Sequence, residues 1–364
     1  MAMQLLSIAT ALPQYDMTQS VAARYAQTHC GPDAGQQRRL PRIYQRCGID
    51  RRSSVLLEPG NGSGPVLSFY PPADDAGDCG PTTDSRMSRY SAEAPRLAWR
   101  CAEDALQQAS ITPQSVTHLV TVSCTGFQAP GFDVELIKQL RLRPTVSRTH
   151  VGFMGCHGAF NAMRTARAYV DADKGAVVLV CAVELCSLHF QYGSGRQRIV
   201  ANALFADGAA AFVGVADSSG RRPGTWKVAA NGSCILPDSE KEMTWRIGDH
   251  GFVMTLSRRV PELIGLHLRP WLSAWLAELG LELSQVGSWA IHPGGPSIVS
   301  AVAEALQLSP AAVEPSRQVL AECGNMSSPT VLFIIDRLQR QGAARPCVAL
   351  GFGPGLTAES VLLT

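Results

Sequence analysis

The stretch VGFMGCHGAF, Val151–Phe160, places a cysteine beside a histidine in an apolar segment that contains three glycines. The residues that follow, NAMRTARAYV, are apolar or small on nearly every side of a helix, which predicts a deeply buried helix. A thiol at the N-terminus of such a helix lies at the positive end of the helix dipole, which lowers its pKa, and the helix-terminal amides can stabilise an oxyanion. Because free cysteine is also a common core residue, the stretch alone leaves Cys156 as a nucleophile, a metal ligand or a packing residue.

The segments around this stretch recur in the second half of the chain. A strand THLVTVSCTG, the GCHGA helix and a strand GAVVLVCAVE are matched by a strand VGSWAIHPGG, a helix after CGNMSSPT and a strand RPCVALGFGPG. Cys124 precedes Cys156 by 32 residues, and His292 precedes Asn325 by 33. The spacing predicts two pseudo-twofold related α/β halves with parallel strands buried under helices. We expect an N-terminal half, residues 1–216, that carries the cysteine, and a C-terminal half, residues 217–364, that carries the histidine and the asparagine.

Composition narrows the class of protein. The chain has 364 residues, 46% hydrophobic and 17% charged, with a formal net charge of +2, which argues against a nucleic acid or a membrane surface as partner. The early apolar run LLSIATAL is too short for a membrane span and predicts a first strand. Eleven cysteines without a CxxC pair predict a reducing, cytoplasmic location rather than a disulfide framework. Residues 58–83 predict a long loop, and Pro95 predicts a kink or a start in the following helix.

Three polar residues are candidates for a site with Cys156. His292 ends an apolar strand and is followed by PGGP, a rigid turn that holds an imidazole at the mouth of a cleft, so we favour it over His157 as the partner of the thiol. His157 points elsewhere on the helix and is expected to pack against a neighbouring element. Asn325 is either a helix N-cap or a donor to a developing oxyanion. No pair of residues shows the ligand spacing of a zinc site.

Together these motifs resemble the type III polyketide synthases, the chalcone-synthase-like branch of the thiolase fold. The motifs are GCHGA with Cys156, ALFADGAAA at residues 203–211, IHPGGP with His292, GNMSSPT with Asn325, and GFGPG with Gly353. The resemblance implies an α/β, αβαβα layered homodimer that uses acyl-CoA starters and malonyl-CoA, with no metal or organic redox cofactor. It implies that Cys156 takes the starter as a thioester. His292 keeps the thiolate ion-paired and then joins Asn325 in stabilising the enolate that decarboxylation leaves.

The resemblance also implies binding residues. Phe205 matches the gatekeeper aromatic between the coenzyme A tunnel and the cavity. Arg39, Arg42 and Arg46 lie at i, i+3 and i+7, one face of a helix, and match the positions that hold the coenzyme A phosphates. A solvated charge stripe is the alternative. Pro41 lies among them and predicts an early or distorted helix.

The cavity positions suggest the starter. They are Cys124, Thr125, Ala129, Cys186, His189, Met254 and Gly353, and Trp245 stands where plant enzymes have a small glycine. Met254 suits an aliphatic chain better than a stacked ring. The neighbouring stretches resemble bacterial alkylpyrone and alkylresorcinol synthases, which implies a fatty acyl-CoA starter. The alternatives are a tetrahydroxynaphthalene synthase that uses malonyl-CoA alone, a ketoacyl synthase III that uses acyl carrier protein, and a thiolase-fold scaffold without activity. We expect Cys124 and Cys186 to shape the cavity.

Overall fold

The computed structural model describes residues 2–29, 34–60, 64–75, 77–217 and 225–364. Nine strands of this described part form one mixed sheet in the order β13-β14-β15-β10-β1-β9-β8-β6-β7. Their bounds are β1 Met3–Ala11, β6 His118–Ser123, β7 Ser147–Gly152, β8 Val177–Leu185, β9 Asp207–Ala216, β10 Lys227–Ile235, β13 Ser288–Ile291, β14 Cys347–Gly353 and β15 Thr357–Leu363.

The pairing pattern is the same on both sides of the central contact between β1 and β10. On one side β1 pairs antiparallel with β9, β9 antiparallel with β8, and β8 parallel with β6. On the other side β10 pairs antiparallel with β15, β15 antiparallel with β14, and β14 parallel with β13. Strand β7, parallel to β6, extends the first side. The repeated pattern confirms the prediction of two pseudo-twofold halves, while their boundary at residues 216 and 217 stays a prediction.

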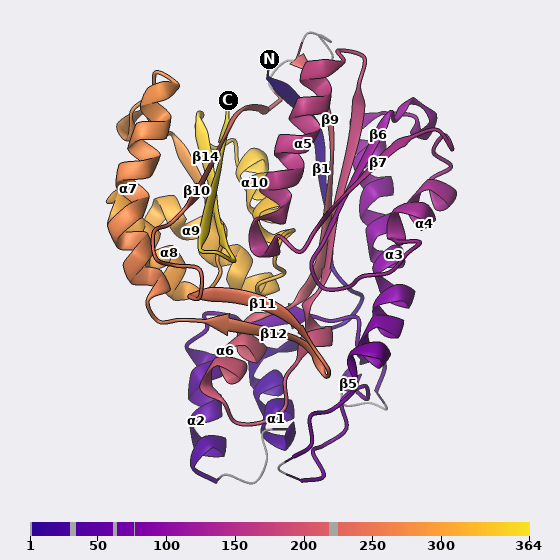
Figure 1. Ribbon diagram of the computed structural model, residues 1–364, viewed down its shortest axis with the longest axis vertical. Helices are drawn as coiled ribbons and strands as arrows, with labels where there is room; N and C mark the ends of the chain where they lie inside the picture. The colour runs from indigo at the N-terminus through magenta and orange to yellow at the C-terminus, as the bar shows by residue number, and fades with distance from the viewer. Residues whose placement is uncertain (1, 30–33, 61–63, 76, 218–224) are drawn as a thin grey trace.

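The helices add three layers to the two halves of the sheet (Figure 1). Helices α5, Gly158–Ala172, and α10, Thr330–Arg340, lie between the two half-sheets and share one core cluster with both. The outer face of the first half is covered by α3, Thr83–Ala109, with α4, Phe132–Gln139, packed on α3. The outer face of the second half is covered by α7, Val260–Glu278, and α8, Pro296–Leu306, while α9, Pro310–Cys323, contacts α10 and β13. This is the predicted αβαβα arrangement.

The alternation of side chains along β9 shows why its sequence is apolar throughout. Ala210 and Phe212 pack in the central cluster with α5 and α10, while Ala209, Ala211 and Val213 pack in the cluster with α3. Because helices cover both faces of the strand, neither face can be polar.

A smaller assembly lies against one end of the main sheet. It contains α1, Gln19–His29, α2, Ala34–Gln45, and α6, Arg196–Leu204, which share a core cluster. The hairpin of β11, Met243–Gly248, and β12, Gly251–Leu256, crosses the molecule between these helices and the main sheet (Figure 1). Two short antiparallel pairs join the N-terminal segments: β2, Asp16–Thr18, with β3, Arg51–Ser53, and β4, Leu57–Glu58, with β5, Val66–Leu67.

Local predictions have mixed outcomes. The run LLSIATAL lies in β1, as predicted, and the described part of residues 58–83 holds no helix before α3. Pro95, by contrast, neither starts nor ends a helix, because α3 is continuous around it. The face of α3 that carries Ala94, Ala98 and Cys101 is fully buried, and this packing offsets the hydrogen bond that proline removes. No helix in the described ranges is both long and apolar enough to cross a bilayer.

Candidate active site

Cys156 lies in a short helical turn, Gly155–His157, directly before α5, and it is buried. Gly155 has φ +69, and a Cβ at this position would lie 2.5 Å from Cδ of Pro354, so the approach to the thiol requires glycine. His157 faces away from the thiol: its Nδ1 bonds to Oδ1 of Asn161 at 2.8 Å, and its ring packs against Gly353. This confirms the expected packing role of His157.

Asn325 lies in the loop before α10, and its side-chain amide has a fixed orientation. The backbone N–H of Ser327 donates to Oδ1 of Asn325 at 2.8 Å, and the amide N–H of Asn325 hydrogen-bonds the thiol of Cys156. Its backbone forms a bridge to Phe205, in which Asn325 N–H donates to Leu204 O and Ala206 N–H donates to Asn325 O, both at 2.9 Å. The loop therefore presents an N–H donor, not an oxygen, to the sulfur.

His292 follows β13 and is completely buried. Its backbone N–H donates to Leu350 O at 2.8 Å, which fixes the main chain to β14. Neither ring nitrogen has a hydrogen-bonding partner among the residues that the structure describes. A buried imidazole with two unpartnered nitrogens is costly for a purely structural residue and is typical of a group that meets a ligand.

The three predicted residues line one small pocket, here called the histidine pocket. Cys156 comes from the first half of the chain, and His292 and Asn325 come from the second. The rest of its lining is Met243, Met254, Leu256, Gly294, Ile298 and Phe352. The structure thus brings together the thiol, the imidazole and the amide that the sequence predicted to form one site. No group of three possible metal ligands occurs within the described ranges.

The pKa of Cys156 shifts in the direction opposite to the one predicted from the sequence. Burial raises the pKa of Cys156 to about 11, against hydrogen bonds from Ser327 and Asn325 that lower it. Burial likewise lowers the pKa of His292 to about 3. The helix terminus was expected to lower the thiol pKa, but removal of the sulfur from water outweighs it. Burial thus favours the neutral form of both groups.

Glu184 is a site residue that the motifs did not identify. It is the penultimate residue of β8 and is fully buried. Its carboxylate accepts hydrogen bonds from Ser328 Oγ at 2.7 Å, Thr125 Oγ1 at 2.8 Å and the Cys124 N–H at 2.9 Å. Burial raises its pKa to about 7, and its charge raises the pKa of Cys156. Its one sequence signal is a lone acid within the apolar strand VVLVCAVEL.

Glu184→Gln is expected to speed alkylation of Cys156 by iodoacetamide near pH 8. Glu184 is mostly ionised at that pH and opposes formation of the thiolate, so a neutral amide lowers the pKa of Cys156 and enlarges its reactive fraction. We expect a rate increase of about three- to tenfold, since one pKa unit changes the thiolate fraction tenfold. The rate is measured against pH by mass spectrometry of the Cys156 peptide. Asp207→Asn changes another buried carboxylate, one that is not among the main influences on the pKa of Cys156, and should leave the rate nearly unchanged. An equal change in both variants contradicts this role of Glu184.

Most predicted cavity residues line a second small space beside Cys156, here called the thiol pocket. Its lining comprises Cys124, Thr125, Gly155, Cys156, Cys186, Phe205, Met243, Trp245, Met254, Ser327 and Pro354. His189 does not line it, and Gly353 contacts His157 instead. Ala129, which matches the position from which plant enzymes reach into the partner's cavity, lies in a separate surface groove with Phe127 and His150, and its role stays a prediction.

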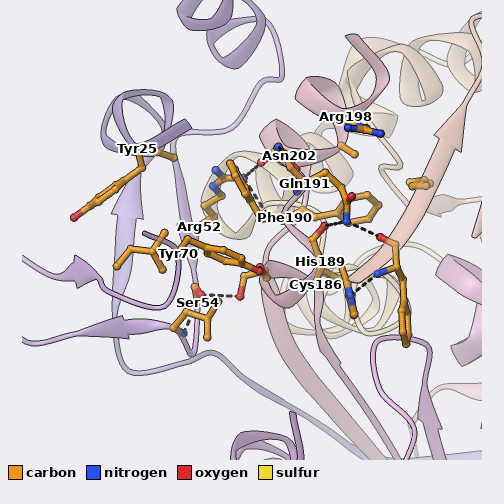
Figure 2. Close-up of a pocket in the computed structure, with 18 of the residues that line it drawn as sticks. Tyr25, Arg52, Ser54, Tyr70, Cys186, His189, Phe190, Gln191, Arg198 and Asn202 are labelled. Atoms are coloured by element: carbon orange, nitrogen blue, oxygen red, sulfur yellow. Dashed lines mark hydrogen bonds between the residues drawn. The ribbon is translucent and has the colours of Figure 1, made fainter. Parts of the chain in front are cut away.

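A larger pocket, here called the outer pocket, adjoins the thiol pocket. The two share the side chains of Cys186, Phe205, Trp245 and Met254. Figure 2 shows Tyr25, Arg52, Tyr70, His189 and Asn202 around the outer pocket. Its further lining includes Met17, Ala22, Leu56, Leu67, Phe190 and Phe252, and no acidic side chain occurs among its described lining residues.

The three arginines proposed for coenzyme A lie at the surface. Arg39 and Arg42 are in α2, Arg46 directly follows it, and all three are exposed. Helix α2 includes Pro41, so the helix continues through the proline that predicted an early or distorted one. None of the three lines the thiol, histidine or outer pocket. Helix α2 packs on α6, which ends at the gatekeeper position Phe205.

A layered pair of α/β halves with a buried cysteine at their junction defines the class of thiolase-fold condensing enzymes. Within that class, the chain belongs to the family of chalcone and stilbene synthases, the type III polyketide synthases: the model of the family's N-terminal domain matches residues 2–218, and that of the C-terminal domain matches residues 227–364. Members of this family are enzymes that condense malonyl-CoA, and they need no cofactor beyond their coenzyme A thioester substrates.

Several relatives match nearly the whole chain. The alpha-pyrone synthesis polyketide synthase-like Pks18 of Mycobacterium tuberculosis is 33% identical over 362 residues, which cover 98% of this chain and 89% of that protein. The 1,3,6,8-tetrahydroxynaphthalene synthase of Streptomyces peucetius is 32% identical, over 98% of this chain and 92% of that protein. Among solved structures, PKS-I of the brown alga Ectocarpus siliculosus has a TM-score of 0.92 and 32% identity, over 100% of this chain and 98% of that chain.

Proposed function

We propose that this enzyme condenses malonyl-CoA repeatedly onto a medium- or long-chain fatty acyl-CoA starter and releases an alkylpyrone or an alkylresorcinol. The observation that carries the proposal is the apolar outer pocket, which adjoins the thiol pocket through four shared side chains. The similarity to an alpha-pyrone synthesis protein supports the same reading.

The proposed chemistry assigns each of the three residues a role. Cys156 transfers its proton to His292 as its sulfur attacks the thioester carbonyl of the starter, and the coenzyme A thiolate leaves and takes up that proton. Malonyl-CoA then loses carbon dioxide, and the resulting enolate oxygen is stabilised by the amide N–H of Asn325 and by His292. The enolate carbon attacks the acyl-Cys156 thioester, which forms a carbon–carbon bond and releases the sulfur for the next round.

The outer pocket accounts for an aliphatic starter. An acyl group on Cys156 occupies the thiol pocket first, and a longer chain extends past Cys186 and Phe205 into the outer pocket. Each methylene moved from water into such a lining contributes about 0.8 kcal/mol. Chains that reach the outer pocket therefore bind more tightly than short ones. Rigid aromatic starters gain less, because flexible Met254 lies in the wall.

A second candidate function is the condensation of malonyl-CoA alone. The identity of 32% to a tetrahydroxynaphthalene synthase favours it, and so does Trp245, whose bulk reduces the thiol pocket. The outer pocket has no role in that reaction, so we rank it second. The carrier-protein and scaffold interpretations have no comparable support.

The three exposed arginines are proposed to bind the coenzyme A phosphates. A triple variant, Arg39→Gln, Arg42→Gln and Arg46→Gln, is expected to raise KM for the acyl-CoA about tenfold at low salt with little change in kcat, because it removes charge-assisted contacts far from the sulfur. Added salt should reduce the difference in KM between the triple variant and the wild type, because it screens the contacts between arginine and phosphate. Steady-state kinetics with the matching N-acetylcysteamine thioester, which has no phosphates, are the control. An equal loss with both substrates contradicts a phosphate-binding role.

We further propose a homodimer in the cytoplasm. Strand β7 is at the edge of the main sheet, and the nearby apolar side chains of Phe127 and Met154 are 42% and 44% exposed. An unpaired edge beside exposed apolar side chains suits a second copy of the chain. The ten described cysteines are all free thiols, which fits a reducing compartment.

The function is tested by product analysis with purified enzyme. Malonyl-CoA is supplied alone and then with acetyl-, hexanoyl-, lauroyl-, palmitoyl- or 4-coumaroyl-CoA, and products are identified by mass spectrometry. Pyrones or resorcinols from the longer aliphatic starters support the proposal. A single product from malonyl-CoA alone favours the naphthalene-forming reaction, and no product from any starter overturns both.

A further inference from the structure

The β11–β12 hairpin carries the wall between the thiol pocket and the outer pocket. Trp245 on β11 is paired directly with Met254 on β12. Both side chains line both pockets. Because a cross-strand pair moves as one unit with its hairpin, the position of the hairpin decides how wide the passage between the two pockets is.

The indole of Trp245 is fixed from two directions. Its Nε1–H donates to the carbonyl of Cys124 at 2.9 Å. Its ring meets the edge of His189 at a centroid distance of 5.3 Å and that of Phe252 at 5.7 Å. The wall is therefore tied to the segment that follows β6 and rests on two aromatic rings.

His189 ties the other strand of the hairpin to the same segment. The backbone N–H of Phe252 on β12 donates to Nδ1 of His189 at 3.0 Å, so Nε2 carries the proton and donates to the carbonyl of Thr125 at 2.8 Å. The imidazole is stacked on the ring of Phe252 at 4.2 Å with an interplanar angle of 14°. Figure 2 shows His189 hydrogen-bonded to this neighbouring backbone.

Further contacts hold the tip of the hairpin, and Nε2 of Gln191 also donates to the Phe252 carbonyl at 3.3 Å. At the tip, the Gly251 N–H donates to Thr83 Oγ1 at 2.9 Å, and the Thr83 N–H donates to Asp249 O at 2.7 Å. Nε2 of Gln191 donates to the His250 carbonyl at 3.1 Å. The hydrogen bonds of His189 and Trp245 lie where the wall borders the pockets. Because Nδ1 of His189 accepts a backbone N–H, the imidazole is neutral, and burial favours the same form by lowering its pKa to about 3.

We propose that His189 is a positioning residue that holds the hairpin against the segment Cys124–Thr125, so that the fixed indole of Trp245 sets how long a starter chain can pass into the outer pocket. This inference rests on the proposed function, in which the chain of the starter enters that pocket. His189 lines the outer pocket, and its positioning role here rests on its two hydrogen bonds.

The test combines a structural and a catalytic measurement on the full-length enzyme. His189→Phe keeps a ring against Phe252 but removes both hydrogen bonds, and Trp245→Phe keeps a ring in the wall but removes the bond to Cys124. Ser7→Ala is the matched control: it removes a buried hydrogen bond to Ala105 O, 2.7 Å long, that lies outside all three pockets. Hydrogen exchange of peptides that span Met243–Leu256 measures how firmly the hairpin is held, and it does not require activity. The ratio of kcat/KM for palmitoyl-CoA to that for hexanoyl-CoA measures how readily a long chain passes into the outer pocket.

We expect faster exchange in the hairpin of both aromatic variants and a rise of about fivefold in the palmitoyl-to-hexanoyl ratio, the size of one net hydrogen bond. The Ser7→Ala control should lose thermal stability but change neither the exchange rate of the hairpin nor the palmitoyl-to-hexanoyl ratio. Unchanged exchange, or an unchanged ratio in an active enzyme, overturns the inference. If the wild type forms no product from any acyl-CoA, the proposed function fails, and the exchange measurement still decides whether His189 holds the hairpin. If His189→Phe does not fold, Trp245→Phe decides by the same two measurements.

Discussion

Cys156→Ala is expected to abolish product formation from every starter, a loss of at least about 10³-fold, because no other group replaces a sulfur that forms the acyl intermediate. The fold should tolerate the change. Cys156 packs among small and apolar side chains, and its removal leaves the hydrogen bond between Asn325 and Ser327 intact. Product analysis and intact-protein mass spectrometry, which detects the acylated enzyme, measure the loss directly.

Two neighbouring thiols provide the controls for this prediction. Cys124 and Cys186 line the same pocket as Cys156. Burial raises the pKa of each well above its ordinary value. Cys124→Ala and Cys186→Ser should alter product length or rate but keep acylation at position 156. If Cys186→Ser alone abolished acyl loading in a folded protein, our view that Cys186 only shapes the cavity would be wrong.

Asn325→Ala is expected to slow decarboxylation of malonyl-CoA about 10²–10³-fold, the usual effect of removing one oxyanion donor. Oδ1 of Asn325 accepts the Ser327 N–H at 2.8 Å, so the amide N–H is free to face the sulfur and the developing enolate. Release of carbon dioxide from malonyl-CoA without a starter measures this step apart from acyl loading.

Asn325→Asp separates electrostatics from local structure. One carboxylate oxygen can still accept the Ser327 N–H, so the loop and the thermal stability should be kept, while the other puts negative charge where the enolate forms. We expect decarboxylation at least as slow as in Asn325→Ala, with a melting temperature closer to that of the wild type. If the aspartate variant decarboxylates at the wild-type rate, the N–H donor of Asn325 has no role in this step.

Burial of Cys156 and His292 bears on when the proton moves from the thiol to the imidazole. Burial favours the uncharged forms of both Cys156 and His292, and no hydrogen-bonding partner among the described residues occupies the imidazole. The proton is therefore expected to move as the thioester arrives, when charge can be delocalised onto the carbonyl oxygen. The neutral thiol should also resist alkylation near neutral pH.

The sequence by itself predicted the fold and the three residues that the structure brings together in the histidine pocket. The matched spacings of Cys124 to Cys156 and of His292 to Asn325 express a duplicated unit, and the apolar strands around them require helices on both faces. Such periodicity is a property of the chain order, so it can be read before folding. The glycine next to the thiol is also visible in the sequence, and the structure gives its reason: Gly155 tolerates no Cβ beside Pro354.

Tertiary structure alone decided the electrostatics and the walls of the site. The sign of the Cys156 pKa shift depends on burial, which outweighs the helix terminus, and Glu184 acts on that thiol across 28 residues of chain. His189 was expected in the cavity lining and lines the outer pocket, but only the structure shows that it also joins the Thr125 carbonyl to the backbone of Phe252. Desolvation and hydrogen bonds between distant segments depend on which groups meet in space. Sequence spacing does not contain that information, because many folded arrangements share the same local pattern.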